Sequence, residues 1–228
     1  RNKHMKKLLN TFLILCSVIS YAQSGYHFNK KIFGYTLDQI TLMTDDGDSK
    51  LYIDDLLFKM FNPDSTVSDF ELAMGYYGFV LQPDYNPDKY IGLEMQVMAL
   101  NNKHEWTKAK KLADSLVTNY PTCLMGHVEL SYAFNSLQDT VQAALYRRIY
   151  ERLSNMIFQT GDGLSMETAY IVTGYKDIEV LTQLMRMRIK KRKRKTKKKS
   201  TFEIVTVYKN FEKMDVYFDT SLITEFKK

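Results

Sequence analysis

Two stretches of the chain, ALNNKHEWTKAKKLADSLV at residues 99–117 and AFNSLQDTVQAALYRRIYE at residues 133–151, share a pattern at a spacing of 34 residues. Small, apolar or polar residues recur at equivalent places, namely Ala99 and Ala133, Leu100 and Phe134, Asn102 and Ser136, and Ala109 and Ala143. Small side chains let two helices approach closely, and Pro121 interrupts the helical pattern after the first stretch. The pattern predicts two helix-turn-helix units that stack on each other.

The spacing resembles that of the tetratricopeptide (TPR) repeat, in which neighbouring units build a common core. The sequence departs from that pattern at His127, where a large apolar residue is usual, and at Arg147, where an aromatic residue is expected. Only two units are recognisable, whereas a free-standing array needs at least three. We therefore expect a TPR-like antiparallel helical layer within residues 49–160, with an unrelated helical bundle as the alternative.

Helix-start signals recur through this region. Asn62-Pro63-Asp64 and Asn86-Pro87-Asp88 each place a capping side chain before a proline that suits the first helical position. Asn102 with Glu105, and Asp139 with Gln142, have the spacing of a capping box. After Thr66 one apolar stripe runs at steps of three and four, through Phe70, Ala73, Met74, Tyr77 and Leu81.

The apolar period changes to two after Gly161-Asp162-Gly163. Segments rich in β-branched and aromatic residues predict strands at Ala169–Thr173, Phe202–Tyr208 and Asp215–Asp219, and a short helix is expected at Asp177–Met185. Residues 23–48 are expected to form an irregular arm with at most one short strand. The predicted fold is therefore α+β, with the TPR-like antiparallel helical layer followed by a small C-terminal sheet with a short helix over residues 161–228.

Residues 1–22 have the order of a secretory signal peptide. The positive Met5-Lys6-Lys7 is followed by the apolar stretch Leu8–Ile19 and by Ser20-Tyr21-Ala22, which suits signal peptidase. The stretch is shorter than the ~20 apolar residues of a permanent span. We expect an exported protein, periplasmic or extracellular, with no membrane span after cleavage before Gln23. Arg1–His4 are interpreted as upstream of the start methionine.

Removing residues 1–22 changes the composition. The formal net charge falls from +6 to +2, because four cations and no acidic residue are lost. Cys16 is lost as well, so Cys123 is left as a single cysteine that cannot form an internal disulfide. We expect Cys123 to be a buried structural thiol rather than a nucleophile.

The tract Arg186–Lys199 holds eleven cations and no acidic residue, whereas the rest of residues 23–228 carries a net charge of −9. Adjacent charges ~6 Å apart repel by ~0.7 kcal/mol in water. We therefore predict a basic, solvated loop over residues 186–199, with an error of sequence or reading frame as one alternative. The other is polyanion contact through Lys190, Lys191, Arg192, Lys193, Arg194 and Lys195. No aromatic residue interrupts these charges, so the tract lacks the stacking platform of a single-strand nucleic-acid binder.

Few residues suggest chemistry. Asp162, Ser165 and Glu167 follow the first glycine of the Gly-Asp-Gly segment, and a triad of Asp162, Ser165 and His127 can be written, but no G-x-S-x-G elbow surrounds the serine. Asp45-Asp46-Gly47-Asp48 does not fit a calcium-binding loop and is predicted to be a turn. No histidine has metal-ligand spacing. We therefore predict no catalytic residue, metal or cofactor.

Tyr76 and Tyr77 are consecutive on a predicted helix, so both cannot face the core, and one is expected to line a groove. Together with Gly78-Phe79, with the TPR-like middle and with the Gly161–Tyr170 segment (GDGLSMETAY), these tyrosines resemble the domain-of-unknown-function family 4919. The closing Val216-Tyr217-Phe218-Asp219 is also similar to that family's final strand. The resemblance covers most of residues 45–225, although the family has a helix and a polar linker where this chain has the basic tract.

The family resemblance implies an exported protein of Bacteroidetes-type bacteria and this architecture, and it implies no activity. Our leading functional hypothesis is a non-enzymatic binding or scaffold module of the cell envelope, whose helical layer offers a groove to a protein or peptide partner. One alternative is a small envelope hydrolase with a site near Asp162 and Ser165. A further alternative is a polyanion binder that uses the basic tract.

Overall fold

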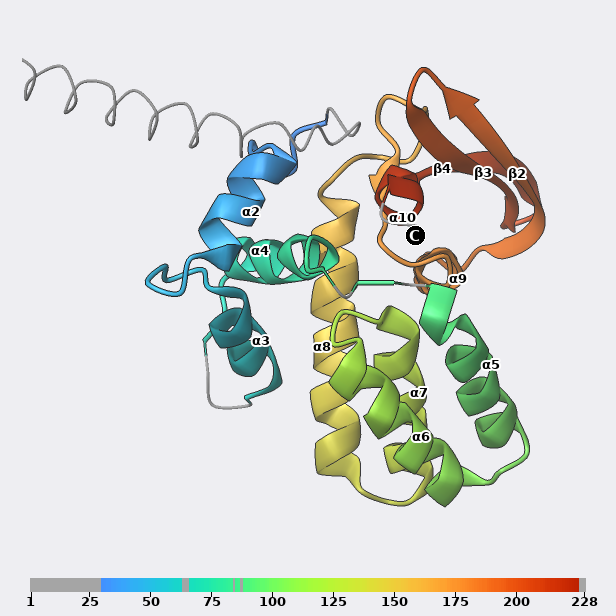
Figure 1. The fold of residues 1–228 in the computed structure, drawn as a ribbon. Coiled ribbons are helices and arrows are strands. Elements are labelled where there is room, and N and C mark those ends of the chain that lie inside the picture. Colours follow the sequence, from blue (N-terminus) through green and yellow to red (C-terminus); the bar gives the residue numbers. More distant parts are fainter. Residues whose placement is uncertain (1–29, 63–65, 84, 87, 226–228) are drawn as a thin grey trace, which may run out of the picture.

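The computed structural model describes residues 30–62, 66–83, 85, 86 and 88–225. The predicted signal peptide at residues 1–22 lies outside this part of the chain. Within the described residues, helices come first and a four-stranded sheet follows, so the predicted α+β class is confirmed. Figure 1 shows the sheet beside the C-terminal end of the long helix α8, Thr140–Phe158, with α9, Asp177–Leu184, below it.

The first helix corrects the prediction of an irregular arm over residues 23–48. Helix α2, Leu37–Asp45, begins with a capping box between Thr36 and Gln39. Its buried side chains are Leu37, Ile40 and Thr44. This apolar face spans little more than two turns, which is too short for its period to be recognised in the sequence.

Helix α3, Ile53–Phe61, follows a turn at Asp45-Asp46-Gly47-Asp48, as predicted. The Asp46 side chain accepts a hydrogen bond from the Asp48 backbone nitrogen at 3.0 Å. Helix α4, Asp69–Val80, begins with a capping box between Ser68 and Glu71, well after the Asn62 cap that the sequence suggested. Residues 63–65 of that segment lie outside the described part.

The 34-residue repeat corresponds to two antiparallel helix pairs. The helices are α5, Asp88–Asn102, paired with α6, Trp106–Asn119, and α7, Leu124–Ser136, paired with α8. Ala109 and Ala143, which are equivalent in the repeat, are both buried. These helices are compatible with the TPR-like pattern.

The turns inside the two pairs have the same geometry at the same spacing. His104 and Gln138 both adopt positive φ, at 60° and 67°. The backbone nitrogens of Glu105 and Asp139 donate to the carbonyls of Leu100 and Phe134, in each case at 2.9 Å. The repeat in the sequence is therefore a repeat of backbone structure.

The predicted caps of α6 and α8 have different outcomes. Asn102 is the last residue of α5, and Glu105 makes no side-chain cap, so the first predicted capping box is wrong. The Asp139 side chain does accept a hydrogen bond from the Gln142 backbone nitrogen at 3.1 Å, which confirms the start of α8.

The sheet has the strand order β1-β4-β3-β2. Its strands are β1, Tyr170–Ile171, β2, Arg188–Lys197, β3, Ser200–Lys209, and β4, Glu212–Asp219. Strand β1 is parallel to β4, and the other neighbours are antiparallel. Helix α9 lies between β1 and β2 in the chain, and the short helix α10, Ser221–Glu225, ends the described part. The predicted strands and the predicted helix at residues 177–185 are confirmed.

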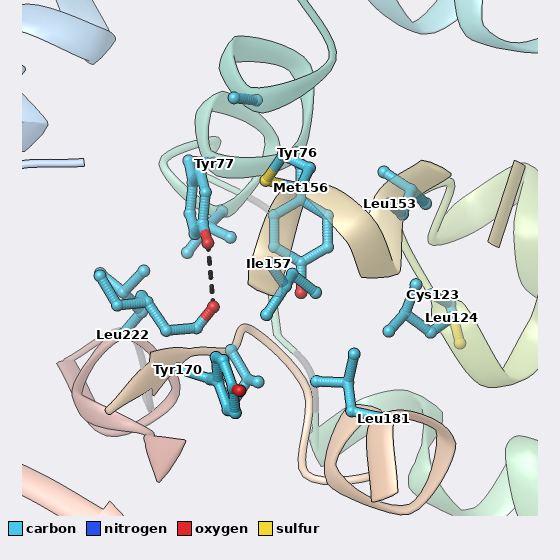
Figure 2. Close-up of a cluster of buried hydrophobic side chains, with 14 of the residues drawn as sticks. Tyr76, Tyr77, Cys123, Leu124, Leu153, Met156, Ile157, Tyr170, Leu181 and Leu222 are labelled. Atoms are coloured by element: carbon cyan, nitrogen blue, oxygen red, sulfur yellow. Dashed lines mark hydrogen bonds between the residues drawn. The ribbon is translucent and has the colours of Figure 1, made fainter. Parts of the chain in front are cut away.

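One apolar core joins the helices to the sheet. It extends from α2 through α4 and α8 to β4 and α10. Figure 2 shows side chains from both regions meeting in it, among them Met156 of α8, Tyr170 of β1 and Leu222 of α10. No helix in the described part of the chain is long and apolar enough to cross a bilayer.

Candidate functional site

The basic tract is a β-strand, so the prediction of a solvated loop over residues 186–199 is wrong for most of its length. Strand β2 forms the edge of the sheet and pairs with β3 from Arg188 opposite Tyr208 to Lys197 opposite Ser200. Backbone hydrogen bonds to β3 hold the strand extended, and extension separates the charges. The register shifts between Ile189 and Lys191, so Lys190 is the extra residue of a bulge.

Alternation along β2 sorts its cations onto two faces. Arg192 and Arg194 share a face with the buried Val205 and Glu203 of β3 and reach carboxylates of the protein body. Arg192 pairs with Glu179 of α9 at 3.2 Å, and Arg194 pairs with Glu203 of β3 at 2.8 Å. The guanidinium of Arg194 also lies 5.1 Å from the ring centre of Tyr175. Both arginines are therefore ion-paired within the fold, and Arg192 shares Glu179 with Lys176, whose ammonium lies 3.0 Å from that carboxylate.

Lys191, Lys193 and Lys195 occupy the opposite, outer face of β2. Their side chains are exposed, and none of the three forms an ion pair with any described residue. Alternate residues of a strand are ~7 Å apart, so neighbouring ammonium groups at that spacing repel by ~0.6 kcal/mol in water. We call these three residues the lysine row. Its charges face one direction, and the acidic side chain of Asp215 on the same face lies two strands away, hydrogen-bonded to Thr206 at 2.7 Å.

At both ends of the lysine row, the neighbouring lysines of β2 have partners within the protein. At one end, Lys190 Nζ donates to the Tyr208 hydroxyl at 2.9 Å, and this hydrogen bond lowers the pKa of Tyr208. At the other end, Lys197 pairs with Glu167 at 2.8 Å, and that bond lowers the pKa of Glu167 to about 2. Glu167 is thus an ion-pair partner of the strand that carries the row.

The outer face also carries aromatic residues, which sequence reasoning missed. Tyr217 of β4 lies opposite Ile204 of β3, which lies opposite Lys193. Tyr208 shares this face beside Lys190. The tract itself contains no aromatic residue, but antiparallel pairing brings these two tyrosines next to it. Finding them from the sequence would have required residues 188–197 to be recognised as a strand and the registers of β2 with β3 and of β3 with β4 to be known.

The loop that contains Asp162 and Ser165 closes on itself. The Asp162 carboxylate accepts from the Leu164 backbone nitrogen at 2.9 Å and from the Thr168 hydroxyl, and the latter lowers the pKa of Asp162. The Ser165 hydroxyl accepts from the backbone nitrogens of Glu167 and Thr168, each at 3.2 Å. These bonds give both side chains a role in shaping the loop.

The structure does not bring His127 to this loop. His127 is buried in α7, with Nε2 2.7 Å from the Pro121 carbonyl, and burial lowers its pKa to about 4. Gly161 is needed at the base of the loop, because a Cβ there would lie 2.1 Å from the Thr168 carbonyl oxygen. The arrangement of the Gly-Asp-Gly segment is that of a structural turn before β1.

Tyr76 and Tyr77 are both completely buried, so the prediction that one lines a groove is wrong. Their rings meet edge to face at a centroid distance of 4.9 Å, and both point into the core shown in Figure 2. The Tyr76 hydroxyl donates to Asp177 at 2.8 Å, and the Tyr77 hydroxyl donates to the Ile171 carbonyl at 2.9 Å. Both face inward because α4 is covered on several sides, by α2, α3, α8 and the C-terminal region.

These tyrosines and the Gly-Asp-Gly loop hold the helical layer against the sheet, and a family model spans both regions. The model described as Domain of unknown function (DUF4919) matches residues 38–228. The chain belongs to this family. No curated protein and no solved structure matches the chain.

Asp177 and Glu94 are two of the buried carboxyl groups of this DUF4919 chain, and sequence reasoning missed both. Asp177 accepts from the Gly174 backbone nitrogen at 2.8 Å in addition to Tyr76, and burial raises its pKa to about 7. The thiol of Cys123 donates to Glu94 at 3.1 Å, and burial raises the pKa of Glu94 to about 7. Cys123 is buried, as predicted, but no sequence pattern pointed to its carboxyl partner.

An apolar groove of about 630 Å³ lies where α3 faces α6 and α8. Phe58 at its wall is 71% exposed. Asp114 also lines the groove, and partial burial raises the pKa of its carboxyl group. The other apolar lining residues are Leu57, Phe61, Val117, Pro121 and Tyr146.

Proposed function

We propose that this DUF4919 chain is an exported, non-enzymatic binding module of the cell envelope, and that the outer face of its sheet binds a polyanion. The observation that carries the proposal is the sorting of cations along β2. Arg192 and Arg194 have carboxylate partners, whereas Lys191, Lys193 and Lys195 have none among the described residues. The export part of the proposal rests on residues 1–22.

Electrostatics favours this face over the rest of the molecule. Outside the basic tract, residues 23–228 carry a net charge of −9 and repel a polyanion. The lysine row attracts one, and an anion placed along it also relieves the repulsion between neighbouring lysines. Each lysine that neutralises an anionic group of a nucleic acid or similar polyanion releases counterions, so binding should weaken steeply with salt.

Retention on heparin at increasing salt tests the proposal. We expect the variant Lys191→Gln/Lys193→Gln/Lys195→Gln to elute at lower salt than the parent protein, with a log–log salt slope smaller by about 2 to 3. The control Lys50→Gln/Lys103→Gln/Lys111→Gln removes the same charge from exposed positions elsewhere and should leave retention almost unchanged. Equal losses in both variants would mean that heparin responds only to overall charge and would overturn the proposal.

The apolar groove supports a second candidate, which is binding of an extended peptide. Phe58 offers exposed apolar area, and Asp114 beside it favours a peptide that carries a lysine or arginine next to an apolar residue. A peptide array should show binding to such sequences, and Phe58→Ser should reduce it. An array with no bound peptide would remove this candidate.

The hydrolase alternative gains no support, because the Ser165 hydroxyl accepts hydrogen bonds from backbone nitrogens of its own turn.

A further inference from the structure

The hairpin between β3 and β4 ends in an unusual turn. Asn210 and Phe211 both adopt positive φ, at 50° and 69°. A two-residue hairpin turn with both φ angles positive is normally built from Asn-Gly, because glycine has no side chain to clash in this region. Here the second position holds a phenylalanine, which is a backbone outlier for a bulky residue.

Packing does not explain the phenylalanine. Phe211 is fully exposed, at 102% of its reference area. It lines a depression of about 980 Å³ with Arg188, Lys190 and Tyr208, together with Ile189 and Asn210. The turn thus carries backbone strain while presenting a large apolar side chain to solvent, a combination typical of a side chain that serves binding.

Cations surround this tip. Lys209 and Lys213 flank the turn, and the start of β2 brings Arg188 and Lys190 beside it, because Arg188 pairs with Tyr208. None of these four residues forms an ion pair with a described residue, and Glu212 is the one acidic side chain within the turn segment 209–213. The lysine row continues along β2 from this end.

We propose that the β3–β4 hairpin inserts Phe211 into the surface of an anionic lipid bilayer, while the surrounding cations contact the lipid phosphates. The inference rests on the proposed function and names the polyanion as a lipid surface. A soluble polyanion uses cations but has no apolar layer to receive a protruding aromatic ring. A bilayer interface binds both the ring and the cations, because the ring enters the boundary of the acyl chains and the cations stay at the anionic headgroups.

The experiment is cosedimentation with vesicles made of equal parts phosphatidylglycerol and phosphatidylcholine, compared with pure phosphatidylcholine. It uses the exported chain, residues 23–228, so that the apolar stretch at residues 8–19 does not itself bind lipid. We expect binding to the anionic vesicles only. Phe211→Gly should weaken that binding about tenfold, the effect of losing one buried aromatic side chain.

Phe211→Gly separates binding from folding. Glycine fits positive φ without strain, so the thermal midpoint should be unchanged or higher. Its retention on heparin should stay that of the parent protein, because no cation is lost. Leu42→Ser removes another exposed apolar side chain, on α2, and should leave vesicle binding unchanged.

The outcomes distinguish the two proposals. Vesicle binding that is unchanged by Phe211→Gly, or equal on the two vesicle types, would overturn insertion into an anionic surface. Retention on heparin without any vesicle binding would overturn the lipid inference but keep polyanion binding. If the parent protein shows neither retention on heparin nor binding to anionic vesicles, both proposals are overturned.

Discussion

The joint between α4 and α9 and the outer face of β2 both gather groups that can carry charge, but the protein treats them in opposite ways. In the joint, Asp177 is enclosed and accepts hydrogen bonds from Tyr76 and Gly174. On the outer face, Lys191 and Lys193 are exposed and have no acidic partner among the described residues.

The difference teaches where each group acts. A buried carboxyl group that lost its hydrogen-bond partners would lower the free energy of unfolding, so its hydrogen bonds serve the stability of the fold. An exposed ammonium costs little to leave without a partner, because water solvates it. The joint therefore maintains the arrangement of the two regions, and the outer face is free to bind something else. Substitutions in the joint should change stability, and substitutions on the outer face should change binding.

The largest effect is expected for Asp177→Ala. Removing the carboxyl leaves the Tyr76 hydroxyl and the Gly174 backbone nitrogen buried without their acceptor, at a cost of about 3–5 kcal/mol in the free energy of unfolding. Urea denaturation measures this loss. Heparin retention of the folded fraction should be unchanged. A loss below about 1 kcal/mol would show that the joint does not depend on these bonds.

A smaller effect is expected from the pH dependence of stability. The pKa of Glu94 is about 7 in the folded protein, whereas its ordinary value, taken for the unfolded chain, is 4.5. Between pH 4.5 and pH 7 the folded state therefore binds more protons than the unfolded state. Its contribution to stability is therefore complete below about pH 4.5 and is lost as the pH rises to about 7, with a slope of up to about 1.4 kcal/mol per pH unit.

Glu94→Gln should remove this slope while its amide oxygen still accepts from Cys123. Urea unfolding at several pH values between 4.5 and 7.5 measures the difference between the variant and the parent protein. Glu151→Gln, at an exposed position of α8, is the matched control and should leave the curve in place. Parallel curves for Glu94→Gln and the parent would contradict the buried, protonated state of Glu94.

The smallest effect separates the two faces of β2. Arg194→Gln should cost up to about 1 kcal/mol, because Glu203 loses its ion-pair partner at a mostly buried position. Lys193→Gln, one residue away, should change stability by less than about 0.5 kcal/mol. Thermal unfolding compares the two variants. Equal losses would mean that the faces do not differ.

Periodic features were predictable because they are local. The 34-residue spacing of Ala109 and Ala143 gave the two helix pairs, and β-branched runs gave β3 and β4. Prediction failed where distant residues decide the outcome. Tyr76 and Tyr77 are both buried because separate elements cover α4 on several sides, and no property of that helix alone could show this.

Distant residues also decided the structure of the basic tract, so its prediction failed for the same reason. Repulsion between its neighbouring charges favours solvation, which is the reason for the loop prediction. Strand pairing with residues 200–209 and the carboxylates of Glu179 and Glu203 outweigh that repulsion, and all of these partners lie outside the tract. The strained position of Phe211 was likewise invisible, because its positive φ depends on the hairpin that the two strands form.

The sequence by itself determined the α+β class, the helical repeat, the positions of β3 and β4 and the family of this protein, because each follows from residues close together in the chain or from their spacing. Only the tertiary structure decided which cations of β2 are ion-paired and which are free, where Asp177 and Glu94 are buried, and that Phe211 stands at an exposed tip. Those properties depend on which distant groups come within bonding distance, and that is fixed only when the helices and the sheet pack together.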